Sequence, residues 1–512
     1  MELDARALAD GTTIDADLCI IGAGPVGLAL ADALRESGLQ VAIVESGSRR
    51  DDPDIDKLNA GDATGDRYGD LRDTRSRGMG GTTARWNTIV RGEAGAKYLP
   101  LDEIDFERRE WAAWSGWPFP RAYMNQYYSA AQTVCGLGPF DYAATRWSDG
   151  DHPLLPVPAG GLITGVYQYG TAAVFREAIP SRLAVSPAVQ LLHGATVTEL
   201  VRAAGRGGIV AARWSTLTGA HGVVRAKRVV LAAGAVENAR LLLLRARADG
   251  RFSEGSDWLG RGFMEHPIDS TLELRSRAPA LRSESSFYLP HAVAGAPAVM
   301  GRIALAPELL REMQLPNATV RMVDAEEPRV LRSSAPRGVA RRLVPMQGAR
   351  RTIGNAIRGL AGVRNRIRGT TYRLLIDLEQ FPHRDNRVVL SDGVDRFGQS
   401  RAALQWRWRP EDEAHRVRIR DTVSRELERA AVGRTAIDPG RRLDPRAHHH
   451  AGTTRMHVDP GEGVVDDMLR VHGEENLYVA GASVFPTAGV ANPTLTAIAL
   501  ALRLADHLGG RG

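Results

Sequence analysis

Three consecutive histidines near the end of the chain, His448, His449 and His450, carry the side chain best suited to moving protons at neutral pH. An imidazole titrates at about pH 6.5 and can act as a general base. If the segment is extended, neighbouring side chains point to opposite faces, and His449 then stands alone on one face. Any one of the three could instead be a solvated or core imidazole. The run therefore predicts a proton acceptor without fixing which residue it is.

Near the other end, Gly22, Gly24 and Gly27 follow G-x-G-x-x-G spacing. In a dinucleotide site the first glycine permits a tight turn, and the second lets a pyrophosphate approach the backbone. The third lets the helix pack on the strand. Glu45 follows at a distance where a carboxylate accepts a hydrogen bond from a ribose hydroxyl.

The elements that must position these glycines are also indicated. Residues 18–21 form a short apolar run, typical of a strand buried on both faces. A helical stretch follows the glycines and ends at Gly38, and residues 41–44 form a second strand leading into Glu45. This order favours dinucleotide binding over a plain glycine-rich turn, and it does not separate FAD from NAD.

A loop at residues 74–90, rich in glycine and threonine, contains Gly80, Gly81, Thr82 and Trp86. Its backbone N–H groups and small side chains could hold an anion or a planar ring. The alternative is a flexible surface turn.

Further strands are predicted within residues 189–212, which include Val197, and at residues 228–231. The latter leads through a glycine turn at Ala233 into a helix over residues 237–244. A Rossmann-type strand so far from the first one suggests a nucleotide-binding domain interrupted by inserted segments. Val197 and Ala233 are predicted to contact the cofactor.

From about residue 275 to 445 the pattern changes. Residues 387–390 and 402–408 alternate like antiparallel strands with one solvated face, as in a second, substrate-facing domain. Residues 337–373 carry ten arginines and no acidic residue. Apolar residues at helical spacing within that segment predict a basic amphipathic helix, which we expect to pack on its own domain. The alternatives are an anionic membrane surface or an acidic partner.

The composition limits the class of protein. A chain of 512 residues, 43% hydrophobic and 25% charged, is globular and exceeds one ordinary core. The net charge of +6 rests on the basic segment alone, so nucleic-acid binding is not expected. Cys19 and Cys135 are the only cysteines, which excludes a disulfide framework and cysteine-rich metal centres; no metal is predicted. Lacking a signal peptide and a long apolar run, the protein is expected to be cytoplasmic.

Several stretches together make the chain resemble the glucose–methanol–choline (GMC) family of flavin oxidoreductases, in particular pyranose oxidases and bacterial glycoside oxidases. They are the N-terminal glycine motif and the sequences GGTTARW, LAAGAVENARLLL, FMEHP, HHHAGTT and ANPTLT. The resemblance implies FAD as the cofactor. It also implies an α/β fold, in which a Rossmann-like FAD-binding domain carries an inserted α+β substrate domain built on an antiparallel sheet, as in p-hydroxybenzoate hydroxylase. The FAD-binding domain is expected at residues 1–100, 180–275 and 445–512, and the substrate domain at 101–179 and 276–444.

The resemblance also assigns the catalytic pair. The family histidine falls on His449 and its partner on Asn492. Alcohol oxidation requires loss of the hydroxyl proton while the carbinol hydride passes to flavin N5, so His449 is expected to be the base. The Asn492 amide would hold the hydroxyl without adding charge.

Three more positions are expected along the flavin: Gly481, Ala482 and Thr494. Many family members have aspartate where Gly481 stands, so one polar contact to the cofactor is expected to be missing or replaced. Thr494 begins a helix to residue 508, whose N-terminus would stabilise negative charge on the reduced ring. Some pyranose oxidases tether FAD through a histidine at the position of Arg85, so here FAD is expected to be non-covalent.

The sequence thus predicts an FAD-dependent enzyme that oxidises a CH–OH group of a sugar, glycoside or aminoglycoside-like metabolite, with dioxygen or a quinone as acceptor. The main alternative is a lyase of the same fold that keeps FAD structurally, as hydroxynitrile lyases do. A flavin monooxygenase and a non-catalytic interaction protein are less favoured. The substrate, the oligomeric state and the role of the basic segment stay open.

Overall fold

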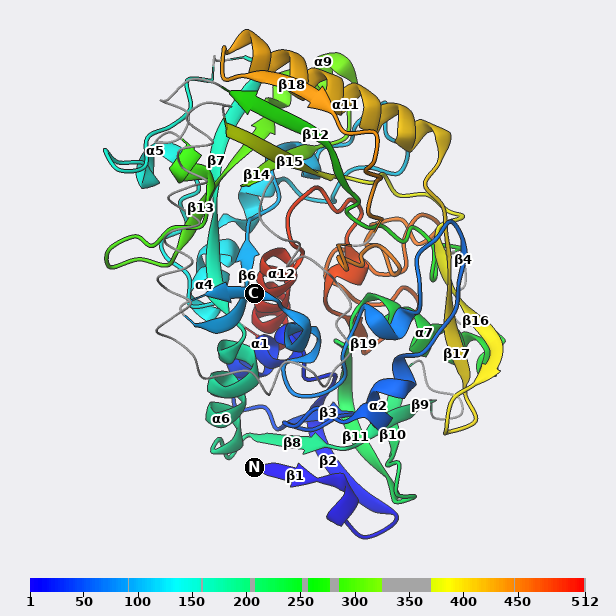
Figure 1. The fold of residues 1–512 in the computed structure, drawn as a ribbon. Coiled ribbons are helices and arrows are strands. Elements are labelled where there is room, and N and C mark those ends of the chain that lie inside the picture. The colour runs from blue at the N-terminus through cyan, green and yellow to red at the C-terminus, as the bar shows by residue number, and fades with distance from the viewer. Residues whose placement is uncertain are drawn as a thin grey trace.

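The computed structural model describes residues 1–510 apart from 91, 158–159, 203–207, 251–256, 277–284, 325–369 and 446. The helix predicted within residues 337–373 lies outside the described residues. Two large sheets stand at opposite ends of the molecule, with helix α12 (Thr494–Leu508) and helix α1 (Pro25–Leu34) between them (Figure 1).

The first sheet has parallel strands at its centre and an antiparallel hairpin at one edge. Its order is β1, β8, β3, β2, β11, β10, β9, and β19 pairs with β11. Strands β1, β8, β3, β2, β11 and β19 pair with one another in parallel, whereas β10 is antiparallel to both β11 and β9. The strands are β1 (Glu2–Asp4), β2 (Thr12–Ile21), β3 (Val41–Glu45), β8 (Val189–His193), β9 (Thr196–Arg202), β10 (Ile209–Ser215), β11 (His221–Leu231) and β19 (Leu477–Val479).

The second sheet is antiparallel throughout and has the order β18, β12, β15, β14, β13, β7, β6, β5. Helix α11 (Pro410–Arg429) covers its outer face, and buries Ile419, Val423 and Leu427 in the core of this sheet (Figure 1). The strands are β5 (Thr88–Val90), β6 (Glu93–Tyr98), β7 (Leu162–Thr171), β12 (Ile268–Ser276), β13 (Val299–Leu305), β14 (Ala318–Asp324), β15 (Thr370–Leu378) and β18 (Arg434–Ile437).

A small third sheet joins distant parts of the chain. Strands β16 (Arg387–Val394) and β17 (Ser400–Trp406) form the expected antiparallel pair, and β17 also pairs in parallel with β4 (Ala63–Gly65). Helix α7 (Ala235–Asp249) packs beside it and follows the predicted glycine turn. The other α-helices among the described residues are short, namely α2 (Pro53–Asp56), α3 (Glu103–Phe106), α4 (Asn125–Val134), α5 (Ala144–Trp147), α6 (Ile179–Ala184) and α9 (Pro307–Met313).

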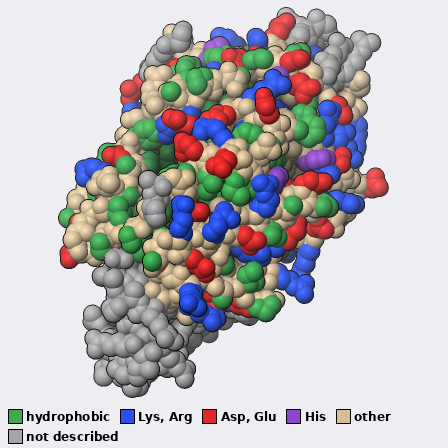
Figure 2. Space-filling view, turned by 90° about the horizontal axis from the view of Figure 1, so that it is seen from above, with side chains coloured by type: hydrophobic (Ala, Val, Ile, Leu, Met, Phe, Trp, Pro, Cys, Tyr) green, Lys and Arg blue, Asp and Glu red, His purple; other side chains and the backbone are tan. Residues whose placement is uncertain are grey.

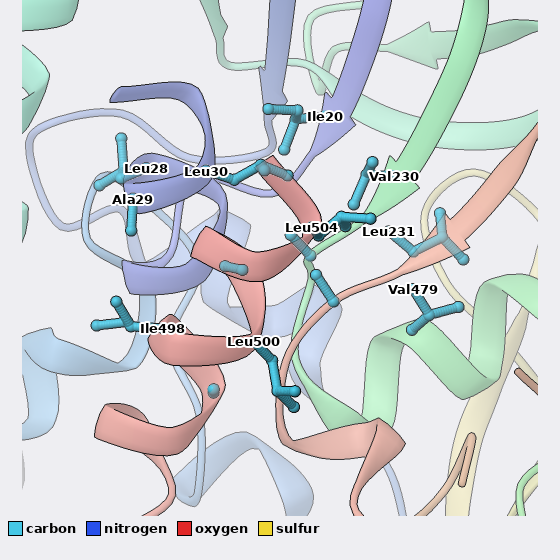
Figure 3. Packing of buried hydrophobic residues seen from close by; sticks show 14 of the residues in the cluster. Ile20, Leu28, Ala29, Leu30, Val230, Leu231, Val479, Ile498, Leu500 and Leu504 are labelled. Atoms are coloured by element: carbon cyan, nitrogen blue, oxygen red, sulfur yellow. The ribbon is translucent and has the colours of Figure 1, made fainter. Parts of the chain in front are cut away.

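The largest core lies where the first sheet meets α1 and α12. Figure 3 shows Ile20 of β2 and Val230 of β11 facing the apolar side chains of both helices, among them Leu30 and Leu504. These four side chains are at most 1% exposed. Burying an aliphatic side chain of this size contributes about 1.5–3 kcal/mol. This core therefore fixes the C-terminal helix, and the residues before it, against the N-terminal glycine turn.

The predicted fold class is confirmed: a Rossmann-like sheet is combined with a second, antiparallel sheet. The domain limits themselves stay a prediction. The strand pairing shows that β12, within the segment 180–275 expected in the FAD-binding domain, belongs to the second sheet, as do β5 and β6.

The surface carries charges of both signs. On the face seen in Figure 2, acidic and basic side chains are interspersed over the described residues. Among the described helices, none is long and apolar enough to span a membrane.

Candidate active site

One large cavity follows the carboxyl ends of β2, β3 and β11 and reaches the start of α12. All of the predicted cofactor contacts line it except Gly27 and Gly80, and both predicted catalytic residues lie at its wall. The predicted residues along it are Gly22, Gly24, Glu45, Gly81, Thr82, Trp86, Val197, Ala233, His449, Gly481, Ala482, Asn492 and Thr494.

The three glycines of the motif have different surroundings. Gly22 has φ +109°, and a Cβ there would lie 2.7 Å from the carbonyl oxygen of Ala232. Gly24 is the N-cap of α1, and a Cβ there would meet nothing within 4 Å, so its backbone faces open space. At Gly27 a Cβ would lie only 2.0 Å from the carbonyl oxygen of Gly22. Gly27 therefore permits close packing of helix on strand, away from the cavity.

Glu45 ends β3 with its carboxylate turned into the cavity wall. Oε2 accepts from the N–H of Ala23 at 2.8 Å, and Oε1 accepts from the N–H groups of Gly47 and Gly78 at 3.0 and 2.9 Å. Burial raises the pKa of Glu45, and these backbone hydrogen bonds oppose that rise. A carboxylate has about four acceptor sites, so one remains for a ribose hydroxyl.

The glycine- and threonine-rich loop closes the side of the cavity. Its residues Gly81–Arg85 form a 3-10 turn, and Trp86 packs edge-on against Tyr98 and Phe175. Gly80 has φ +81°, and a Cβ there would lie 2.8 Å from Cγ of Arg176 and 2.9 Å from Oγ1 of Thr83, so it packs against these side chains and does not line the cavity.

His449 and Asn492 meet at the inner end of the cavity. Nε2 of His449 lies 2.9 Å from Nδ2 of Asn492, and Nδ1 of His449 lies 2.9 Å from Nδ1 of His266. Asn492 is held because Pro493 and Thr494 immediately begin α12. The amide oxygen of Asn492 has no hydrogen-bond partner among the described residues.

The extended backbone on which the separation of the three histidines depends is not formed. His448, His449 and His450 all line the cavity, because His448 has φ +63° and so the segment is not extended. The imidazole of His450 nevertheless makes a hydrogen bond away from His449 and Asn492, because its Nε2 lies 2.8 Å from the hydroxyl of Tyr68.

His449 is neutral at physiological pH. Burial lowers its pKa well below the ordinary 6.5, and the nearby His266 and Lys97 lower it further. Burial likewise lowers the pKa of His266 to about 4 and that of His450 to about 3. A neutral imidazole is the form that can accept a proton.

Sequence reasoning missed the support behind this pair. Glu265 is fully buried, and its carboxylate accepts from the Tyr68 hydroxyl at 2.5 Å and from the N–H groups of His449 and His266 at 3.0 and 3.1 Å. Burial raises the pKa of Glu265 to about 7. The only signal was the FMEHP stretch, which was used for the resemblance without assigning a role to either residue.

A buried ionic cluster beside the cavity was also missed. Arg75 and Arg77 both contact Glu237 of α7, with nitrogen–oxygen distances of 3.1 and 2.9 Å. The three guanidinium groups around it, including that of Arg240, hold the pKa of Glu237 well below its usual range even though burial opposes this. No group of three or more possible metal ligands occurs among the described residues.

Comparison with known proteins places this geometry in a family. A family model described as GMC oxidoreductase matches residues 382–501, and one for an FAD-binding domain matches residues 15–53. Paromamine 6'-oxidase from Streptomyces fradiae is 26% identical over 96% of this chain and 91% of its own length. The matched C-terminal segment contains both His449 and Asn492. Residues 382–501 therefore carry the C-terminal domain of the GMC oxidoreductases.

Other relatives match over shorter regions. C-glycoside 3-oxidase from Arthrobacter globiformis is 38% identical over 23% of each chain, and pyranose 2-oxidase from Lyophyllum shimeji is 34% identical over 27% of this chain and 23% of its own. The expected resemblance to sugar and glycoside oxidases is thus confirmed.

Solved structures support the fold. A formate oxidase superposes with a TM-score of 0.57 at 16% identity, covering 98% of this chain and 99% of its own. Pyridoxine 4-oxidase from Mesorbium loti gives 0.52 at 18% identity, covering 96% and 98%. FAD is the cofactor, in line with the FAD-binding domain matched at residues 15–53. The open backbone faces at Gly24, Gly234 and Gly481, where a Cβ would meet nothing within 4 Å, fit a cofactor that lies against the main chain.

Proposed function

We propose that this protein oxidises a CH–OH group of a sugar, glycoside or aminoglycoside-like compound to a carbonyl. The observation that carries the proposal is the contact of 2.9 Å between His449 Nε2 and Asn492 Nδ2 in the wall of the FAD cavity. Two side chains that can bind one hydroxyl group thus converge beside the cofactor site.

His449 acts as the base in this proposal. Oxidation of a carbinol removes one proton from oxygen and one hydride from carbon, and bound FAD supplies the hydride acceptor. His449 takes the hydroxyl proton on Nε2, because its lowered pKa keeps the imidazole neutral and ready to accept. The low basicity is offset because the hydroxyl becomes far more acidic as the hydride leaves.

Asn492 orients the substrate. Its amide carries both a donor and an acceptor, so it can hold a hydroxyl group beside His449 and add no charge. Holding reacting groups in place supplies a large share of the acceleration in such reactions. The unpartnered amide oxygen of Asn492 is available for that contact.

The relatives support this substrate class. They include paromamine 6'-oxidase and 6'''-hydroxyparomomycin C oxidase, which are 26% and 28% identical over 96% of this chain. The electron acceptor is dioxygen or a quinone. The relatives include enzymes named as oxidases and one named as a dehydrogenase, the fructose dehydrogenase large subunit from Gluconobacter japonicus, which is 35% identical over 25% of this chain. These names give the lyase alternative no support.

We also propose that FAD is held without a covalent bond. Arg85 occupies the position of the tethering histidine, and its guanidinium donates to the backbone oxygens of Arg75 and Arg72 at 2.8 and 2.7 Å. Acid precipitation should therefore release all yellow colour into the supernatant; colour left in the pellet would contradict this. The free, buried Cys19 and Cys135 fit the proposed cytoplasmic location.

The main test is anaerobic flavin bleaching. We expect sugars, glycosides or aminoglycosides to reduce the bound flavin, and His449→Ala to keep FAD but slow its reduction by about 100- to 10,000-fold, the usual contribution of a general base. Reoxidation with air or a quinone then identifies the acceptor. An unchanged reduction rate in His449→Ala would remove His449 from the mechanism, and cyanide release from a cyanohydrin without bleaching would favour the lyase.

A further inference from the structure

His266 lies on the side of His449 away from Asn492. The two rings are nearly perpendicular, at 78°, with their centroids 5.0 Å apart and their Nδ1 atoms 2.9 Å apart. His266 is 1% exposed, so water does not compete for this contact. The ring of His449 is thus held between an amide on one nitrogen and an imidazole on the other.

The backbone fixes this arrangement independently of the rings. Met264 and Ala451 form an antiparallel bridge, with hydrogen bonds of 3.0 and 3.2 Å between their backbone groups. Glu265 then accepts from the N–H groups of both His266 and His449. The segments that carry the two histidines are therefore joined both by the Met264–Ala451 bridge and through the Glu265 side chain.

Counting protons shows which nitrogen of His449 carries the lone pair. Two neutral imidazoles joined through Nδ1 share one proton, which belongs to either His449 or His266. The amide nitrogen of Asn492, 2.9 Å from His449 Nε2, can only donate, so Nε2 carries a lone pair. The proton of neutral His449 then resides on Nδ1 and is donated to Nδ1 of His266.

We propose that His266 is a positioning residue that fixes the tautomer of His449. Its Nδ1 accepts the Nδ1–H of His449, a buried donor that would otherwise lack an acceptor. Together with the Asn492 amide, this contact keeps the proton off Nε2, whose lone pair takes the substrate hydroxyl when that hydroxyl replaces the amide hydrogen. The opposite tautomer would place a proton on Nε2 and block proton uptake there. This role rests on the proposed function of His449 as the base.

A histidine suits this position better than a carboxylate. A carboxylate on Nδ1 would also fix the tautomer, but its charge would raise the pKa of His449 and fill Nε2 with a proton. A neutral acceptor orients the ring without charging it. The charged and titratable groups that act on the two rings are Lys97, Asp377, Glu379 and His448.

The first test reads the tautomer directly. FAD-loaded protein labelled with ¹⁵N-histidine is compared by NMR with the variant His266→Leu, which removes the acceptor, and with His266→Asn, which offers an amide oxygen. The spectrum of His449→Gln assigns the His449 signals. We expect one tautomer, protonated on Nδ1, in the native protein, a mixture in His266→Leu, and substantial recovery in His266→Asn. Protonation on Nε2 in the native protein would overturn the proposal.

The second test is kinetic and separates positioning from structure. Removing such a supporting group costs about 10- to 100-fold, and we expect that loss in the flavin reduction rate constant of His266→Leu. Bound FAD and the substrate Kd should stay unchanged, and His266→Asn should recover most of the rate. Loss of FAD in both variants, or an unchanged rate in His266→Leu, would contradict positioning. If no CH–OH compound reduces the native protein, the proposed function fails, whereas the NMR result still decides the tautomer.

Discussion

The buried carboxyl of Glu265 makes the stability of the protein depend on pH in a direction opposite to that of an ion-paired acid. Its pKa rises from 4.5 in the unfolded chain to about 7 in the folded protein because of burial. Between these values the folded state binds more protons than the unfolded state. The resulting stabilisation is complete below pH 4.5 and is lost as the pH rises through 7.

The size of the effect follows from the shift. One pKa unit corresponds to about 1.4 kcal/mol, so the whole transition is worth about 3 kcal/mol, of which about 2.5 kcal/mol falls between roughly pH 5 and pH 8.5. Glu265→Gln removes this titration and keeps an oxygen for the backbone N–H groups. We therefore expect the free energy of unfolding of Glu265→Gln, measured relative to that of the native protein, to rise by about 2.5 kcal/mol between roughly pH 5 and pH 8.5.

Urea unfolding followed by flavin and tryptophan fluorescence at several pH values measures this difference. The background pH dependence cancels because both proteins share it. Glu308→Gln is a matched control, since the side chain of Glu308 is 79% exposed and its surroundings change little on unfolding. If the free energies of unfolding of Glu265→Gln and the native protein differ by the same amount from pH 5 to 8.5, the argument that folding raises the pKa of Glu265 is refuted.

Four further substitutions, at three positions, test the cavity and the glycine turn beside it. Gly27→Ala should destabilise the fold by about 1–3 kcal/mol or more, because its Cβ would lie 2.0 Å from a backbone oxygen; an unchanged Tm would contradict this. Gly24→Ser should leave the Tm of the FAD-free protein unchanged but weaken FAD binding in a fluorescence titration, since the added group enters open space. Asn492→Asp should move the pH profile of flavin reduction to higher pH by raising the pKa of His449, and Asn492→Ala should lower the rate without that displacement.

Local pattern was enough to predict the elements that frame the cavity. The predicted helix from residue 494 to 508 coincides with α12, and the glycine motif runs from the end of β2 into the first turn of α1. In each case the signal is short-range: apolar periodicity, a proline at the helix start and glycines at fixed spacing.

What the sequence did not predict depends on contacts between distant residues. His266 meets His449 across 183 positions, and Tyr68 meets Glu265 across 197. No local periodicity encodes such pairings. The left-handed backbone at His448 was missed for a related reason, because a residue with a side chain adopts it only when its surroundings enforce it.

Strand β19 has a consequence for how the protein is made. Residues 229–231 of β11 pair with residues 477–479 of β19, so the first sheet is completed only by the last tenth of the chain. During synthesis, residues 229–231 of β11 can pair with β19 only after the segments of the second sheet have been made. Native pairing at such separations is slow, because chain entropy is lost before the contacts form. A chain that ends before β19 leaves residues 229–231 of β11 without this partner and lacks Asn492, so the first sheet and the catalytic pair are completed by the same C-terminal segment.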